Sequence, residues 1–375
     1  MNTLWYFILI MLPAGIAYIY GKRLVVQLKV EKQTRILQFH QFRNSIKMIQ
    51  IFGVVGSVIL FDALHINQFI PWKNRFYLPV IAAIIFFVIL SVNIVFFRFD
   101  QIIRQTTGGI KNYLRVYLGT LLILIVIYWS VLKVLFLMTE YWGTTIKIIQ
   151  LVFLLFILVY GTPCLSPWLV KCIYRTNLLK NQDLKQRFSN FCKKVQVNCR
   201  NILVLETSDI KLSNALAVGL WPQQKYIYLT SYLIERLTLN EIETIFAHEV
   251  AHFKKNHIIK KSHLFFLLYL LIMPIQILVS QLATHEVSLY LFKWIPILVF
   301  IFTYLILSRV IARGHEKECD GFVIDHCEHP EDYEKALAKI YEDNYTPQDL
   351  SSSSHPSLSA RIFFMRKRMQ TKNKG

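Results

Sequence analysis

Seven long runs of apolar residues constrain the fold more than any other feature of this sequence. An α-helix rises 1.5 Å per residue, so about 20 apolar residues cross the roughly 30 Å hydrocarbon core of a bilayer. The chain has 375 residues, 54% of them hydrophobic, and a mean hydropathy of +0.41, which is too apolar for an ordinary soluble protein. We therefore predict a mainly α-helical membrane protein whose seven spans lie at residues 4–20, 49–70, 76–97, 114–138, 146–165, 264–283 and 294–311.

Basic residues between the runs predict how the spans are oriented. Residues 22–47 carry seven Lys or Arg and a single acid, and residues 98–115 carry four against Asp100. Because cytoplasmic loops are enriched in Lys and Arg, both segments should face the cytoplasm. Seven spans then place the polar segments 166–263 and 312–375 in the cytoplasm as well. We expect a multi-pass protein of the plasma membrane whose active site faces that side.

The net charge of +19, from 42 Lys and Arg against 23 Asp and Glu, agrees with this topology. No basic cluster accompanies a recognisable nucleic-acid module, so the predicted partners are the lipid bilayer and a peptide or protein substrate, and no nucleic acid. The first run is expected to be a retained helix, because Lys22 and Arg23 follow it, which reverses the charge order of a signal peptide. The six cysteines form no CxxC pair and are expected to be small apolar fillers.

This topology predicts four parts of the chain. Residues 1–165 form a membrane region with five spans, and residues 264–311 hold the last two. Residues 166–263 and 312–375 are expected to be the first and second parts of a single cytoplasmic protease module. The two segments are separated in the sequence but would share one fold.

The first polar segment has the pattern of strands followed by a helix. Residues 201–206 and 225–230 are rich in β-branched and aromatic side chains, and residues 214–220 are a weaker strand candidate. A helix should begin near Thr238, because Thr238 and Glu241 have the spacing of a capping box.

Residues 248–252 have the sequence His-Glu-Val-Ala-His, the HExxH pattern. Positions i and i+4 lie on one face of a helix, so the imidazoles of His248 and His252 can bind the same metal ion, and neutral imidazole is a good zinc ligand. Glu249 lies beside that face, where it can act as the general base for an attacking water. The pattern alone is short, and two solvated histidines on a surface helix would produce it by chance.

A catalytic zinc site needs a third protein ligand and an open position. We expect Glu316 to be that ligand and Asp320, four residues later, to accept a hydrogen bond from the far nitrogen of a histidine ligand. His315 is the alternative ligand, although it lies off the face that Glu316 and Asp320 share. Glu318 is expected to be an ordinary charged residue, and five other histidines are expected to be solvated or capping residues: His257, His263, His285, His326 and His329.

The order of these motifs resembles the HtpX and CAAX prenyl endopeptidase superfamily of membrane zinc metallopeptidases. HExxH is followed by two spans, by an Arg-x-x-Glu-x-x-x-Asp element, by His-Pro and by Arg-Ile. The matching residues outside HExxH are Arg313, Glu316, Asp320, His355, Pro356, Arg361 and Ile362, with Asn214 and Ala215 resembling an Asn-Ala element of the family. The resemblance is firm over about residues 200–365 and weaker over 1–165. Cys319 departs from the alanine that the family usually has.

The resemblance implies a gluzincin-like α+β module that binds one zinc ion and has an edge strand beside it. Asn214 and Ala215 would begin that strand and bind extended peptide by β-augmentation. Arg361 is also expected to contact substrate. His355 would be a donor to the oxyanion of the reaction, and Arg361 and Arg313 would support the site.

The predicted function is that of a zinc metalloendopeptidase, a hydrolase that acts on membrane-associated proteins or on hydrophobic, possibly lipidated, peptides. The span count resembles the CAAX prenyl endopeptidases. The alternative within the superfamily is HtpX-like quality control of membrane proteins, for which four spans are usual. An alternative of another class is a membrane sensor with a zinc-protease output, and the short predicted outer loops disfavour it.

Overall fold

The computed structural model describes residues 2–26, 32–63, 73–117, 119, 144–199, 201–282, 295–352 and 355–372. The chain divides into two compact units, which are described separately. Unit 1 comprises Met1–Gly119, Ser208–Lys211 and Glu342–Pro347, and unit 2 comprises Thr120–Thr207, Leu212–Tyr341 and Gln348–Gly375. The predicted membrane region 1–165 is thus shared between the units, because the fifth predicted span belongs to unit 2.

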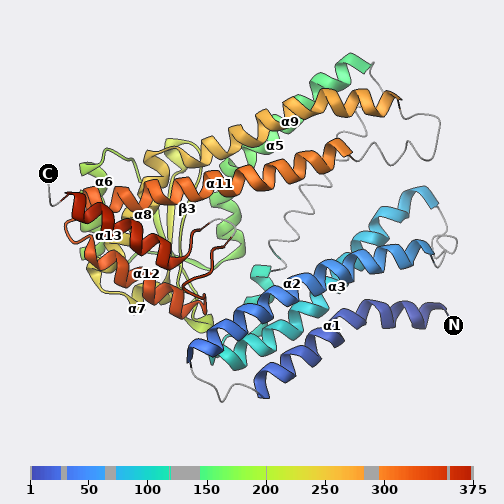
Figure 1. The fold of residues 1–375 in the computed structure, drawn as a ribbon, viewed down its shortest axis with the longest axis horizontal. Helices are drawn as coiled ribbons and strands as arrows, with labels where there is room; N and C mark the ends of the chain where they lie inside the picture. The colour runs from blue at the N-terminus through green and yellow to red at the C-terminus, as the bar shows by residue number, and fades with distance from the viewer. Residues whose placement is uncertain are drawn as a thin grey trace. The chain divides into compact units, whose positions relative to one another are not determined.

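Three long helices lie side by side in unit 1 (Figure 1): α1 (Asn2–Val26), α2 (Lys32–Ala63) and α3 (Lys73–Arg104). Their contact is largely aromatic. The ring of Phe42 stacks on Phe96, with centroids 5.6 Å apart, and meets Phe99 edge-on at 5.8 Å. Gly21 allows α1 to approach, because a Cβ at that position would overlap the ring of Phe99. The chain segment Ser208–Ile210, a short 3₁₀ turn, also belongs to this unit.

The helix α2 begins earlier than the sequence predicted. Residues 22–47 were expected to be a loop, but α2 already starts at Lys32. Phe39, Phe42 and Ile46 recur at helical spacing, and all three are buried against α1 and α3. The apolar face of α2 extends on the N-terminal side of the hydrophobic run that marks the span, and the helix extends with it.

The long helices of unit 2 are α5 (Thr144–Ile173), α9 (His257–Leu282) and α11 (Ile295–His326), and α9 contacts both of the others (Figure 1). Within the described residues, three helical segments are long and apolar enough to cross a membrane: Ala83–Arg104, Val152–Ile173 and His257–Ile275. Large apolar side chains such as Phe153 and Leu271 are exposed on them. Most of the predicted span 114–138 lies outside the described residues, and the total of seven spans stays a prediction.

A four-stranded sheet lies in unit 2, in the order β1-β2-β4-β3. Its strands are β1 (Thr176–Leu178), β2 (Asn201–Leu205), β3 (Ala215–Val218) and β4 (Tyr226–Thr230). β2 and β4 are parallel, whereas β1 and β3 pair antiparallel with β2 and β4 respectively. The three predicted strands are confirmed, and β3 lies at an edge. A short 3₁₀ turn, Pro222–Gln224, joins β3 to β4.

The remaining helices of unit 2 surround one apolar core: α6 (Gln182–Lys194), α7 (Ser231–Arg236), α8 (Leu239–Lys254), α12 (Glu331–Asp343) and α13 (Leu358–Lys372). The predicted capping box opens α8: Thr238 Oγ1 accepts from the N–H of Glu241, and Glu241 Oε2 accepts from the N–H of Thr238. The core joins both polar segments, since Phe188 and Phe246 pack with Phe322 and Leu358 in one cluster. This shared core holds α8 against α11.

Candidate active site

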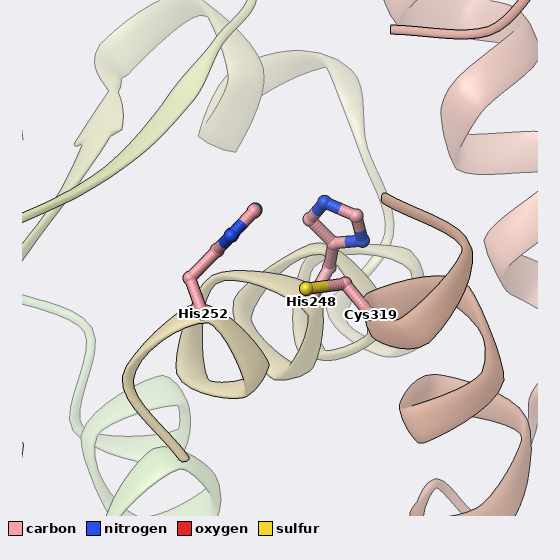
Figure 2. Close-up of side chains that lie close together, drawn as sticks. All are labelled: His248, His252 and Cys319. Carbon is pink, nitrogen blue, oxygen red and sulfur yellow. The ribbon is translucent and has the colours of Figure 1, made fainter. Parts of the chain in front are cut away.

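His248 and His252 extend from the same face of α8, as the HExxH spacing predicts. Their ring centroids are 5.1 Å apart, and His248 is buried while His252 is partly exposed. Figure 2 shows both rings above the turns of α8. One face of a single helix therefore presents two imidazoles to a common point.

Glu316 of α11 completes this group. Its Oε2 lies 3.3 Å from Nε2 of His248, and its Oε1 lies 3.6 Å from Nε2 of His252. The side chain is only 6% exposed. The three residues predicted as metal ligands therefore converge, although 64 residues of sequence separate Glu316 from His252 (316 − 252).

The converging atoms fit a cation. Oε2 of Glu316 is buried, with Nε2 of His248 3.3 Å and Nδ1 of His355 2.8 Å away. A buried carboxylate is costly unless positive charge or hydrogen-bond donors lie beside it. Two imidazole nitrogens and a carboxylate form a donor set that zinc accepts.

Cys319 is a second acidic group within reach of the two imidazoles. Its Sγ and one nitrogen each from His248 and His252 lie within 4.8 Å of one another (Figure 2). Burial raises the pKa of this thiol, and the charges of Glu316 and Glu249 add to that effect, so the sulfur is protonated at neutral pH. Burial also opposes ionisation of Glu316, but His248 and His355 outweigh it and lower the pKa of Glu316 well below its ordinary value. The carboxylate is already ionised in the metal-free chain, whereas the thiol would have to lose its proton to bind a metal.

The far nitrogen of His248 is bound by two residues from different helices. Nδ1 lies 2.7 Å from the hydroxyl of Tyr333 and 3.2 Å from Oδ1 of Asp320, and the Tyr333 hydroxyl donates to the same Oδ1 at 2.8 Å. His248 Nδ1–H is therefore the donor to Tyr333, which leaves Nε2 available for a metal. Asp320 lies where the sequence predicted it. Tyr333 was not predicted, because nothing in its sequence surroundings links α12 to α8.

Arg361 lies beneath this network. Its Nε and Nη2 donate to the two oxygens of Asp320 at 2.9 and 2.6 Å, and Nη2 also donates to the hydroxyl of Tyr333 at 2.6 Å. Burial alone would raise the pKa of Asp320, but Arg361 and His248 outweigh it and hold that pKa at about 2. The resemblance implied that Arg361 supports the site, and its buried bonds to Asp320 and Tyr333 agree with that role. Contact of Arg361 with substrate stays a prediction.

Glu249 is half-buried beside the metal-ligand candidates. Burial is the largest influence on its carboxyl group and raises the pKa. A backbone hydrogen bond from Ala217 of β3 opposes this effect. A carboxylate with a raised pKa is a stronger base, as a general base requires.

The edge strand β3 lies against α8. The backbone of Asn214 is used for pairing with β4, because its carbonyl accepts from the N–H of Thr230 at 3.0 Å. Backbone groups alternate between the partner strand and the open side in an antiparallel pair, so those of Ala215 and Ala217 face the open edge. The side chain of Asn214 is exposed. The predicted substrate strand is therefore an unpaired edge next to the site.

The two remaining predicted residues, His355 and Arg313, are both exposed. The side chain of His355 is 47% exposed, with Nδ1 close to Glu316. Arg313 is exposed on α11, one turn before Glu316, and no hydrogen bond or ion pair joins it to the described residues of the site. The roles that the resemblance implies for His355 and Arg313 stay predictions.

For one of the five remaining histidines, the prediction from the sequence was wrong. His257 was expected to be solvated or capping, but it is buried, and its Nδ1 lies 3.1 Å from Nδ1 of His252. The turn after α8 brings His257 to this position, and the five-residue HExxH motif does not predict that turn. His263 is exposed and bonds a carbonyl of its own helix, as expected, and His285 lies outside the described residues.

The model of Peptidase family M48 matches residues 178–369, which include every residue of this site. The chain belongs to peptidase family M48. This M48 chain is 27% identical over 190 residues to a "Protease HtpX homolog" of Helicobacter pylori, an alignment that covers 42% of the chain and 57% of the relative. The chain thus spans just over half the length of that relative.

The fold of this M48 chain resembles that of Ste24p from S. mikatae. The crystal structure matches with a TM-score of 0.67 and covers 96% of this chain and 98% of that chain, at 15% sequence identity. The similarity of the fold and the family match together confirm the resemblance to the HtpX and CAAX prenyl endopeptidase superfamily.

Proposed function

We propose that this chain is a membrane-embedded zinc metalloendopeptidase that hydrolyses peptide bonds of membrane-associated proteins or hydrophobic peptides. One observation carries the proposal: the carboxylate of Glu316 lies 3.3 Å from Nε2 of His248 and 3.6 Å from Nε2 of His252, and Glu249 lies beside them. Family membership and the apolar helices of the chain support it.

His248, His252 and Glu316 would hold a single zinc ion. When bound, zinc polarises the scissile carbonyl and lowers the pKa of water, so that hydroxide is available near neutral pH. Three protein ligands leave a coordination position open, which distinguishes a catalytic from a structural zinc site. Cys319 is the alternative third ligand. A Glu316→Ala variant that still binds zinc, and a Cys319→Ala variant that does not, would favour it.

The residues around the ligands have separate tasks. The open edge of β3 binds the extended backbone of the substrate through Ala215. Glu249 accepts the proton of the attacking water and passes it to the leaving amine. His355, exposed beside Glu316, would donate an N–H to the oxyanion that develops on the carbonyl.

The substrate is proposed to reach the site from the bilayer. A preference for small lipidated or hydrophobic peptides and an HtpX-like removal of damaged membrane proteins are the two candidates. Mass spectrometry of products from matched lipidated and unlipidated peptides would separate them. Equal cleavage of both sets would exclude the lipid preference.

The test of the function is a Glu249→Gln substitution in the purified full-length chain. Gln keeps the shape of the side chain but cannot accept the proton, so cleavage should fall about 10²- to 10⁴-fold while bound zinc stays near one ion per chain. Glu243→Gln is the matched control, because Glu243 lies on the same helix and pairs with Arg187. It should keep both activity and zinc. A Glu249→Gln enzyme as fast as wild type would refute the assignment of the base.

A further inference from the structure

His257 is a buried histidine beside the metal site that the proposed mechanism does not use. It is the first residue of α9, and its side chain is 4% exposed. α8 ends at Lys254, and Asn256 adopts a left-handed conformation with φ 55°, which asparagine accepts more readily than most residues. This tight turn brings the first side chain of α9 back to the end of α8.

The ring of His257 makes a hydrogen bond at each nitrogen. Nδ1 lies 3.1 Å from Nδ1 of His252, and Nε2 lies 3.1 Å from Oε2 of Glu318. An ionised carboxylate can only accept, so Nε2 of His257 carries the proton. Nδ1 of a neutral His257 is then an acceptor, and it receives the N–H at Nδ1 of His252.

This assignment fixes the state of His252. Because its proton lies on Nδ1, its Nε2 has a free lone pair, and that atom lies 3.6 Å from Oε1 of Glu316. Histidine ligands commonly donate their other N–H to a fixed acceptor, which sets both the tautomer and the orientation of the ring.

Two residues of α11 hold the ring of His257 in place. His315 stacks on it with centroids 3.8 Å apart and 8° between the planes, and Sγ of Cys319 lies 3.6 Å from its Nδ1. The helix that provides Glu316 therefore also fixes the residue that orients His252.

We propose that His257 is a positioning residue which, together with Glu318, holds His252 ready to bind the metal. The inference rests on the proposed zinc site and deepens it. Tyr333 and Asp320 hold His248 in the same way, so each imidazole has its own acceptor.

Two substitutions separate the hydrogen bond from the packing of the ring. His257→Phe keeps an aromatic ring to stack on His315 but removes both nitrogens, whereas His257→Asn loses the ring and keeps an acceptor oxygen near the place of Nδ1. In the purified full-length chain we expect His257→Phe to bind Zn²⁺ about 10- to 100-fold more weakly than wild type. His257→Asn should recover part of that loss.

Glu318→Ala tests the same series of hydrogen bonds, from Glu318 through His257 to His252. It should not disturb the core, because the side chain of Glu318 is 49% exposed. We expect it to weaken Zn²⁺ binding severalfold, less than His257→Phe does. His263→Ala is the control, since His263 is exposed on the same helix and bonds the carbonyl of Ile259. It should bind Zn²⁺ as wild type does.

Loading with Co²⁺ gives a readout that is independent of activity and of fold stability. The visible bands of Co²⁺ depend on ligand geometry, so they should shift in His257→Phe and stay unchanged in His263→Ala. Wild-type affinity and an unchanged spectrum in both His257→Phe and Glu318→Ala would overturn the role of His257. Equal losses in His257→Phe and His257→Asn would also overturn it, because the acceptor would then not matter. A wild-type chain that binds no Zn²⁺ would instead overturn the proposed function.

Discussion

At the scale of single residues, the site is organised around Nδ1 of His248. Arg361 and Asp320 form a fully buried ion pair there, with Tyr333 bonded to both. Removing one partner of such a pair leaves a buried charge and typically costs 3–5 kcal/mol. The pair is neutral as a whole, so the negative charge that faces the two imidazoles comes from Glu316.

Metal binding should release a proton from His248. In the metal-free chain burial lowers the pKa of His248, but Asp320 and Glu316 outweigh it and raise the pKa to about 9. A protonated imidazole cannot bind a metal, so below about pH 9 one proton must leave, and affinity should rise about tenfold per pH unit between roughly pH 6 and 8. His252 adds no such dependence, since burial and the charge of His248 lower its pKa to about 3.

Calorimetry in buffers with different heats of ionisation measures this proton directly. We expect about one proton released per Zn²⁺ bound near pH 7. Zinc binding without proton release would contradict the raised pKa of His248.

The sequence predicted the residues that are linked by helical spacing. His248, Glu249 and His252 lie on one helix, and Glu316 and Asp320 lie one turn apart on another, so a local pattern was enough. Tyr333 was missed, His257 was expected to be solvated or capping, and Arg361 was named only through the family resemblance. Their positions depend on how α9, α12 and α13 pack against α8, and no spacing within one element encodes that packing.

At the scale of elements, β3 is the part of the fold that we propose to bind the substrate. Its open side presents the backbone of Ala215 and Ala217, and Ala217 already bonds Glu249. Ala215 is thus the position where an added strand would pair.

An Ala215→Pro substitution should impair substrate binding selectively. Proline removes an N–H that faces the open edge, which an edge strand tolerates, so the sheet should remain. The loss of about one hydrogen bond predicts a fall of roughly tenfold in kcat/KM, with unchanged zinc affinity. Ala215→Val keeps the N–H and adds bulk, and it should stay closer to wild type. Equal rates for wild type and Ala215→Pro would exclude this edge as the binding strand.

The sequence predicted some helices and strands but not others. The three strands with β-branched and aromatic residues were found, whereas β1, with the sequence Thr-Asn-Leu, is too short and too polar to have a pattern. The start of α2 was missed because its polar first turns carry their apolar residues on one face only. Contacts with other parts of the fold stabilise both β1 and the first turns of α2.

At the scale of the whole molecule, the two halves of the M48 domain are joined by apolar helices. α9 begins five residues after His252, and α11 reaches Glu316 in one unbroken helix. The shared core of unit 2 then closes around residues from both halves. The orientation of this unit in the membrane is our proposal from the distribution of Lys and Arg.

Labelling of intact cells tests that orientation. Glu328 is exposed between α11 and α12, so a Glu328→Cys chain offers a thiol on the surface of unit 2. A membrane-impermeant maleimide should modify position 328 only after the cells are permeabilised, as measured by mass spectrometry. The wild-type chain controls for the native cysteines. Modification in intact cells would reverse the proposed topology.

The continuity of α11 has a consequence for where a substrate is cut. The apolar part of the helix ends near Val310, and Glu316 follows six residues later, about 9 Å along the helix axis. If α11 crosses the bilayer and Glu316 binds the metal, as we propose, this helix fixes the distance between the lipid surface and the site of cleavage. A substrate anchored in the same leaflet would then be cut at a set distance from its anchor, with little dependence on the residues in between.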